Sequence, residues 1–151
     1  MSESVKVKVK RLDNNVDLPL PDYETAGAAG MDIRAALDEK VTLRPGEIRM
    51  IPTGLAVSIP PGYEGQVRPR SGLALKHGIG IVNAPGTIDS DYRGEIGLIL
   101  INWGKQPFIV NRGDRIGQMI ISSVCRADID EVADLDATQR GEGGFGHSGL
   151  E

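Results

Sequence analysis

The feature of this sequence that most restricts its fold is the spacing of its turn-forming residues. Pro-Gly pairs stand at 45–46, 61–62 and 85–86, and the tripeptide Asn-Arg-Gly occupies 111–113. Proline presets φ and glycine permits a positive φ, so each of these sequences favours a tight turn. Many short segments separated by such turns are typical of a β-sandwich, jelly roll or barrel.

The segments between the turns show the period of two that marks a half-buried strand. Val5, Val7 and Val9 alternate with lysines, which puts the valines on one face and the lysines in water. The same pattern predicts strands at 48–59, 63–68, 79–82, 95–102, 108–110 and 116–124. Residues 98–101 (LILI) lack the alternation, which indicates a strand with both faces covered, either central in a sheet or pressed against another subunit.

Helix is nearly absent from the predicted fold. The two candidates are one or two turns at 71–77, where Ser71 is a possible cap, and the acidic stretch 128–136. Residues 138–149 (TQRGEGGFGHSG) hold five glycines and no aliphatic side chain. We expect this tail to be mobile in the free protein, either as a frayed terminus or as a loop whose backbone amides bind a triphosphate.

Length and composition indicate one packed domain. The 151 residues are 40% hydrophobic, and the net charge of −4 excludes the broad basic face that polynucleotide binding needs. No apolar run reaches the length of a membrane span, and the N-terminal residues lack a signal core. The lone Cys125 cannot form an internal disulfide, and its apolar neighbours predict a buried thiol. We therefore expect a cytoplasmic protein with no membrane or nucleic-acid partner.

Two segments in the first half of the chain carry residues suited to chemistry. Small residues surround Asp32 in 26–36, a pattern that also fits a close-packed turn. Segment 68–79 (RPRSGLALKHGI) places the planar donor fork of Arg70 before a serine hydroxyl and an unobstructed glycine amide. Those groups together make a phosphate seat, although an ordinary polar turn has the same composition.

Two further segments follow. Within 83–98, Asp89-Ser90-Asp91 predicts a hairpin turn. The backbone groups of a hairpin can bind the edge of a pyrimidine, and a carboxylate beside it can hold a water. Gln118 is a polar residue inside the strand-like segment 113–119, so it is either exposed or hydrogen-bonded. Residue spacing alone leaves these alternatives open.

These five segments, in this order, resemble the five motifs of the trimeric all-β deoxyuridine triphosphate nucleotidohydrolases, or dUTPases. The resemblance runs from about residue 18 (LPLPDYETAGAAGMDIRA) to residue 149, and GTIDSDYRGEI and RGEGGFGHSG are close to family motifs. It implies that residues 1–137 form a distorted jelly-roll-like β-barrel with at most one short helix. Residues 138–151 would form a flexible, glycine-rich C-terminal arm. It also implies a homotrimer with three shared sites, each closed by the arm of a neighbouring subunit.

The activity that the resemblance implies is hydrolysis of dUTP to dUMP and pyrophosphate, which keeps uracil out of DNA and supplies dUMP for thymidylate synthesis. By position, Asp89 is the carboxylate that orients the attacking water, and Tyr92 is the ring under the deoxyribose. The other substrate-binding residues implied are Asn83, Gly86, Thr87 and Ile88 for uracil, Arg70, Ser71, Gly72 and Gln118 for the phosphates, and Arg140, Gly144, Phe145 and Ser148 for closure of the arm.

Mg²⁺ is the cofactor that the resemblance implies, and Asp32 would meet it indirectly, through a metal-bound water. Mg²⁺ usually keeps several waters and takes substrate phosphates as ligands, so the lack of a carboxylate cluster in this sequence fits that role.

Two alternatives to a dUTPase are weaker. The related deoxycytidine triphosphate deaminases carry a catalytic glutamate ten positions after the hairpin aspartate, where this chain has Ile99, which cannot move a proton. A nucleotide-binding β trimer without activity is the other alternative, and the presence of Asp89 argues against it.

Overall fold

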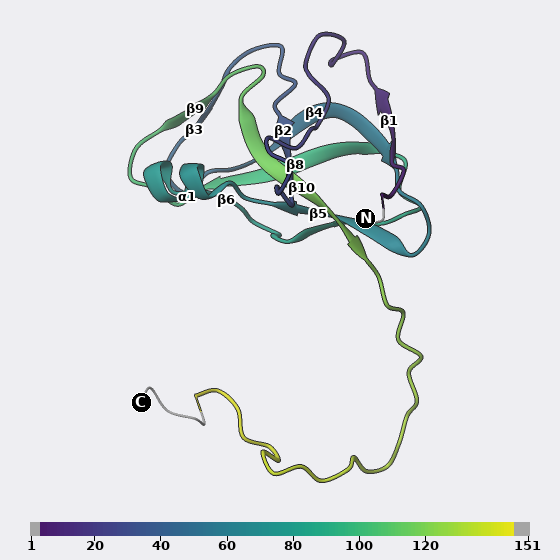
Figure 1. Ribbon diagram of the computed structural model, residues 1–151. Coiled ribbons are helices and arrows are strands. Elements are labelled where there is room, and N and C mark those ends of the chain that lie inside the picture. The colour runs from purple at the N-terminus through teal and green to yellow at the C-terminus, as the bar shows by residue number, and fades with distance from the viewer. Residues whose placement is uncertain (1–3, 147–151) are drawn as a thin grey trace.

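The computed structural model describes residues 4–146, which form two four-stranded antiparallel sheets, one two-stranded ribbon and one short helix (Figure 1). The first sheet has the order β1 (Lys8–Arg11), β4 (Ile48–Ser58), β8 (Glu95–Asn102) and β6 (Ile79–Ile81). The second has the order β2 (Met31–Arg34), β10 (Arg115–Ser123), β5 (Tyr63–Arg68) and β7 (Gly86–Ile88). The ribbon pairs β3 (Val41–Leu43) with β9 (Phe108–Val110), and α1 spans Ser71–His77.

The two larger sheets share one hydrophobic core. Leu98 and Leu100 of β8 and Ile116 and Met119 of β10 are all at most 1% exposed and belong to the same cluster. A methyl group at Gly117 would collide with the Leu98 side chain, so the bare α-carbon lets β10 lie close to the opposite sheet. This mostly β, jelly-roll-like architecture confirms the fold class predicted from the sequence.

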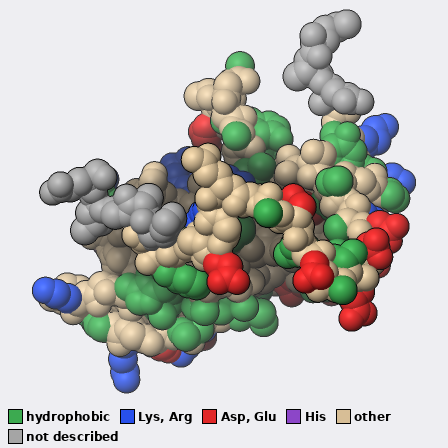
Figure 2. All heavy atoms as spheres, turned by 90° about the horizontal axis from the view of Figure 1, so that it is seen from below, with side chains coloured by type: hydrophobic (Ala, Val, Ile, Leu, Met, Phe, Trp, Pro, Cys, Tyr) green, Lys and Arg blue, Asp and Glu red, His purple; other side chains and the backbone are tan. Residues whose placement is uncertain are grey.

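The central strand β8 has a second apolar face that the core does not use. Ile99 and Ile101 are half-buried on that face and pair in register with Met50 and Ile48 of β4, which are 68% and 54% exposed. In Figure 2, hydrophobic side chains gather on part of the face seen from below. The strand at 98–101 lies inside its sheet, as one of the two predicted alternatives has it, but the predicted cover on both faces is not found, because its outer face remains open within the single chain.

The strand predictions agree with the structure to within a few residues, except that the structure adds strands β2, β3 and β7. The helix predicted at 71–77 is confirmed, but the helix predicted at 128–136 is wrong, because this segment has no regular structure apart from a bend at 133–134. Four aspartates in 128–136 disfavour a helix, and no neighbouring surface in the described chain buries its apolar side chains. No helix within residues 4–146 is long and apolar enough to cross a membrane.

Cys125 is exposed, so the prediction of a buried thiol is wrong. The last strand β10 ends at Ser123, and the chain leaves the sheet there, which puts Cys125 beyond the core. From this point the chain runs away from the body as an extended segment (Figure 1).

A polar network holds the start of β8 in place. The Glu95 carboxylate accepts hydrogen bonds from the Gly54 amide (2.8 Å) and from Asn14 Nδ2 (3.1 Å), at the point where β4 shifts its register against β8. Gly54 has a φ of 62°, a left-handed conformation that favours glycine. The buried Thr53 hydroxyl donates to the carbonyl of Ile96 at 2.6 Å. These bonds fix the strand end from which several pocket residues project.

Arg112 ties the long loop at 12–30 to the body. Its guanidinium donates to the carbonyls of Asn14 (2.9 Å) and Leu37 (3.1 Å) and pairs with Asp17. The hydrogen bond from Arg112 lowers the pKa of the Asp17 carboxyl below its ordinary value. The small stabilisation from this exposed pair is therefore present at neutral pH and is lost as the pH falls through the lowered pKa.

Candidate active site

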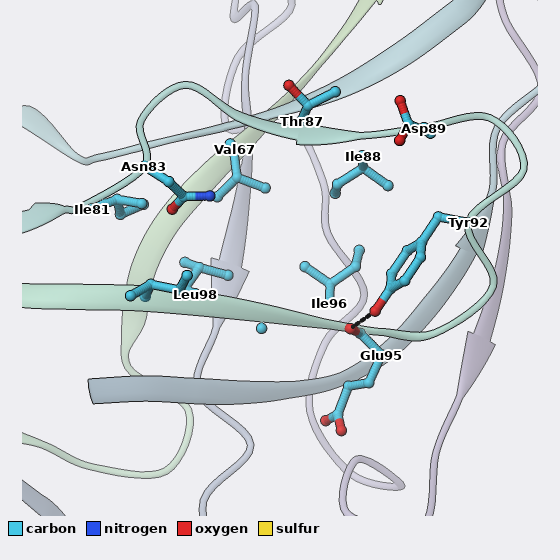
Figure 3. A pocket seen from close by; sticks show the side chains of 13 residues that line it. Val67, Ile81, Asn83, Thr87, Ile88, Asp89, Tyr92, Glu95, Ile96 and Leu98 are labelled. Atoms are coloured by element: carbon cyan, nitrogen blue, oxygen red, sulfur yellow. Dashed lines mark hydrogen bonds between the residues drawn. The ribbon is translucent and has the colours of Figure 1, made fainter. Parts of the chain in front are cut away.

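A cavity of about 190 Å³ opens between the two larger sheets, where β7 of one sheet faces β8 of the other. Figure 3 shows apolar side chains of Val67, Ile88, Ile96 and Leu98 around it, with polar groups at its rim. The residues that line the cavity are Val67, Ile81, Asn83, Gly86, Thr87, Ile88, Asp89, Tyr92, Glu95, Ile96, Gly97, Leu98 and Ile99. A cavity lined by both apolar side chains and polar groups suits a flat, partly polar ring.

The loop at 89–94 is not the turn of a hairpin, which corrects the sequence prediction. Strand β7 pairs with β5, whereas β8 pairs with β4 and β6, so the two flanking strands belong to different sheets. The loop instead holds its own shape, because the Tyr92 amide donates to the Asp89 carbonyl (3.1 Å) and Arg93 Nη1 donates to the Ser90 carbonyl (2.7 Å). The separation of the sheets at this loop is what opens the cavity.

Asp89 and Tyr92 stand at the rim of this cavity. Asp89 directly follows β7 and is exposed, and no side chain of the described residues donates a hydrogen bond to its carboxylate. The hydroxyl of Tyr92 donates to the carbonyl of Glu95 at 2.9 Å, which holds the ring across the start of β8 (Figure 3). An acceptor-only carboxylate without a protein partner is suited to bind and orient a water.

The residues predicted to read uracil lie on β7 and in the segment just before it, on the same side of the cavity as Asp89. Asn83, Gly86, Thr87 and Ile88 all line the cavity. A methyl group at Gly86 would lie 3.3 Å from Asn83 Nδ2, so the Asn83 amide lies over a bare α-carbon. This arrangement gives a flat ligand close access to backbone and amide groups on one edge.

A second cluster gathers charged residues on β2, β10 and the end of β5. Asp32 bonds two arginines at once, with Oδ1 3.1 Å from Arg70 Nε and Oδ2 3.0 Å from Arg115 Nη1. Arg70 Nη1 also donates to the Arg115 carbonyl at 3.3 Å, and Arg115 pairs with Glu24 at 3.2 Å. These bonds use Nε and Nη1 of the Arg70 guanidinium and leave its remaining donors for a ligand.

Gln118 belongs to the same cluster. It lies opposite Asp32 in the register of β10 and β2, and its Nε2 donates to the Pro69 carbonyl at 3.0 Å. A methyl group at Gly30 would collide with the Gln118 side-chain oxygen and lie 3.3 Å from Cδ, so Gly30 leaves space for this side chain. Gln118 is therefore hydrogen-bonded rather than merely exposed.

Ser71 and Gly72 begin α1 and are both exposed. The cap position belongs to Arg70, whose backbone is extended (φ −92°, ψ 130°), so the prediction of Ser71 as the cap is wrong. The Arg70 carbonyl accepts from the Ala74 amide at 3.1 Å while its side chain stays on Asp32. The first turn of α1 thereby lies beside the arginine cluster.

The predicted residues of the arm stand apart from both groups. Arg140 Nε donates to the Gly143 carbonyl at 2.7 Å, a contact within the arm itself, and Phe145 is fully exposed. Gly144 is half-buried in the arm, and Ser148 lies outside the described residues. The single chain thus presents the predicted site residues in three groups: the cavity, the arginine cluster and the arm.

Sequence reasoning missed Arg115, Glu24 and Glu95. Arg115 and Glu24 complete the ion pairs around Asp32, and Glu95 fixes the strand end below Tyr92. Arg115 lies within GDRIGQM, so an arginine three residues before a glutamine on the same strand was a visible signal. The other two interactions join segments far apart in the sequence, which spacing alone does not reveal.

The described residues contain no group of three or more histidine, cysteine, aspartate or glutamate side chains placed to hold a metal ion. Asp32 lies at the centre of the arginine cluster, and its two carboxylate oxygens already accept hydrogen bonds from Arg70 and Arg115. Such a donor set fits Mg²⁺ only if substrate phosphates and waters supply most of its ligands.

We expect Asp32→Asn to weaken phosphate binding by removing one of the two acceptor oxygens that hold Arg70 and Arg115. An amide accepts through one oxygen only, so one arginine loses its partner. The affinity for a non-hydrolysable dUTP analogue, measured by calorimetry, should fall about tenfold, as for loss of one charge-assisted bond. Asp22→Asn is the matched control in an exposed turn. An unchanged affinity in Asp32→Asn would contradict the positioning role of this carboxylate.

Comparison with known proteins shows the family to which the chain belongs. The family model described as dUTPase matches residues 16–149. The chain belongs to the dUTPase family. A deoxyuridine 5'-triphosphate nucleotidohydrolase of Methylocella silvestris is 58% identical over 99% of this chain and 94% of its own length. One from Anaeromyxobacter sp. is 61% identical over 96% of this chain and 98% of its own length.

Solved structures of dUTPases have the same fold. A variant of the Staphylococcus bacteriophage 80alpha dUTPase with dUpNHpp superposes with a TM-score of 0.85 at 29% identity, over 96% of this chain and 99% of that chain. A variant dUTPase of phage phi11 of S. aureus, in which the coordination of a structural Mg(II) ion was described, has a TM-score of 0.77 at 26% identity, over 87% and 99%. The fold of this dUTPase thus matches structures of its own family.

Proposed function

We propose that this dUTPase hydrolyses dUTP to dUMP and pyrophosphate, with Asp89 orienting the water that attacks the α-phosphorus. The observation that carries the proposal is the Asp89 carboxylate, which stands at the rim of the cavity without a side-chain donor from the described residues. The water forms a bond to the α-phosphorus as the bond to the bridging oxygen breaks, and pyrophosphate leaves. The water proton passes to Asp89 or to solvent. Because the water attacks the phosphorus directly, the reaction needs no covalent intermediate.

The cavity supplies the specificity of the proposed reaction. Asn83 and the backbone at 86–88 bind the uracil edge, and the close approach of these atoms excludes a 5-methyl group. Tyr92 lies under the deoxyribose, where a 2′-hydroxyl would clash with the ring. The anchoring of the Tyr92 hydroxyl on the Glu95 carbonyl supports this role, because it gives the ring a fixed position.

The phosphates are bound by the arginine cluster and closed by the arm. The triphosphate is held by Arg70, Ser71, Gly72 and Gln118. The γ-phosphate and the base are covered by the arm residues Arg140, Gly144, Phe145 and Ser148. Positioned cations and amides stabilise the charge that develops on the leaving pyrophosphate. The fixed orientation of Arg70 on Asp32 supports this assignment, since an oriented donor loses little freedom on binding.

Mg²⁺ is the proposed cofactor. When bound with the nucleotide it neutralises phosphate charge and favours one conformation of the triphosphate. Asp32 would hold it indirectly, through a metal-bound water, and its place beside Arg70 puts it next to the proposed phosphate seat.

The active assembly is proposed to be a homotrimer in which residues 1–137 form the barrel and the flexible arm at 138–151 closes a site of a neighbouring subunit. The open apolar face of β4 and β8 supports an assembly, because Met50 and Ile48 are more than half exposed in the single chain. The segment before the arm also exposes Ile129, Val132 and Leu135, which need a surface to pack against. The reaction keeps uracil out of DNA and supplies dUMP for thymidylate synthesis in the cytoplasm.

The test is pyrophosphate release from dUTP, UTP, dTTP and dCTP in the presence of Mg²⁺. We expect rapid release from dUTP and at least about hundredfold lower kcat/KM for UTP and dTTP, because a steric clash excludes more strongly than a missing contact. Binding of a dUTP analogue without any release from dUTP would favour the non-catalytic trimer. Equal turnover of UTP and dUTP would contradict the role of Tyr92.

A further inference from the structure

Gly94 lies against the ring of Tyr92. A methyl group at position 94 would lie 2.6 Å from Cζ and 2.9 Å from Cε2 of Tyr92, and closer still to its hydroxyl oxygen. Such distances are far shorter than van der Waals contact, so any side chain at position 94 would displace the ring. The ring as it stands therefore requires a bare α-carbon at this position.

The backbone itself does not require glycine there. Gly94 is not among the glycines with a positive φ, so an alanine could adopt its conformation. Glycine is needed because a side chain would have no room, and the three atoms nearest to an added methyl group all belong to Tyr92. This separates Gly94 from Gly54 and Gly78, whose φ values of 62° and 67° are left-handed.

Tyr92 has little else to hold it. The residue is 45% exposed, and its side-chain hydrogen bond within the described chain runs from the hydroxyl to the Glu95 carbonyl at 2.9 Å. Figure 3 shows the ring lying between the loop and the start of β8, with that bond at its tip. The bare α-carbon of Gly94 and the Glu95 carbonyl together set the position of the ring at the cavity rim.

We infer that Gly94 is a positioning residue that sets the discrimination between deoxyribose and ribose by holding Tyr92 in its seat. The inference rests on the proposed function, because it assigns the sugar contact to Tyr92. A ring pushed outward by a methyl group no longer fills the space that a 2′-hydroxyl would occupy. The larger effect therefore falls on the rejection of UTP, and the smaller on turnover of dUTP.

The test compares Gly94→Ala with Gly27→Ala, whose added methyl group meets no atom within 4 Å. In Gly94→Ala the ratio of kcat/KM for dUTP to that for UTP should fall at least about tenfold, the effect of one misplaced group in a specificity pocket. Gly27→Ala should keep the wild-type ratio. An unchanged ratio in Gly94→Ala would overturn the inference.

A double-mutant cycle shows whether Gly94 acts through the ring. In a Tyr92→Ala background, the added change Gly94→Ala should leave the ratio unaltered, because no ring remains to be displaced. A further fall of the ratio in that background would overturn the inference. Thermal unfolding of each variant shows whether the fold is retained, and the ratio, unlike total activity, does not depend on the folded fraction.

A measurement without substrate separates this inference from the proposed function. Fluorine NMR of protein labelled with fluorotyrosine gives a signal for Tyr92, assigned by its loss in Tyr92→Phe. That signal should shift in Gly94→Ala and stay in place in Gly27→Ala. An unmoved signal would overturn the positioning role, whereas a wild-type protein inactive on dUTP would overturn the proposed function and leave the NMR result standing.

Discussion

Asp89→Asn should lower the turnover of dUTP at least about a hundredfold, the lower range for loss of a positioned general base. The carboxylate accepts from water and can take its proton, whereas the amide of asparagine is not basic. Steady-state pyrophosphate release measures the effect. The KM should change little, because the proposed contacts to uracil and phosphates come from other residues.

The variant should remain folded, since no side chain of the described residues donates to the Asp89 carboxylate. Asp91→Asn is the matched control, an exposed aspartate two positions along the same loop that does not line the cavity. It should retain most of the wild-type turnover. Near wild-type turnover in Asp89→Asn would remove this residue from the mechanism.

Deletion of residues 140–151 should lower dUTP hydrolysis about a hundredfold, comparable to loss of a charge-stabilising group. The arm bears Arg140 and Phe145, and its described hydrogen bonds run within itself. Ordering the arm costs about 1 to 2 kcal/mol per residue for the backbone, so it closes only where phosphate and base contacts offset this cost. Closure should therefore require the γ-phosphate.

The truncated protein should unfold at the wild-type temperature, because the hydrophobic core of the described residues contains no residue of the deleted segment. Hydrogen exchange of the full-length arm should slow when a non-hydrolysable dUTP analogue and Mg²⁺ are bound, and much less with dUMP. Normal turnover by the truncated protein, or arm exchange that stays fast with the analogue, would contradict the proposed closure.

The fold was largely predictable because period-two patterns and turn residues recur along the chain. Strands at 63–68, 95–102 and 108–110 match the structure at both ends. The pattern missed β2, β3 and β7, which have three or four residues each and therefore give only a weak periodic signal. The pairing partners of the strands were also hidden, since β7 joins β5 and leaves β8 to the other sheet.

The chemistry of the site was predictable only residue by residue. Motif resemblance predicts Asp32 and Arg70 as site residues, and the structure adds that they bond each other and that Arg115 shares the carboxylate. Gly94 shows the same limit, because glycine in a loop predicts a turn, and only the structure shows the tyrosine ring that occupies its free space. Such dependence between side chains arises from packing, which a single sequence does not display.

The most direct test of the shared-site proposal mixes two inactive proteins, Asp89→Asn with an intact arm and the truncated chain with an intact Asp89. Equal amounts are unfolded together and refolded, so that subunits combine at random in trimers. If each site takes Asp89 from one subunit and its arm from another, about a quarter of the sites receive both. We predict about a quarter of wild-type dUTP hydrolysis from the mixture and almost none from either protein alone. A mixture as inactive as its components would contradict the account, because Asp89 and the arm would then have to come from the same chain.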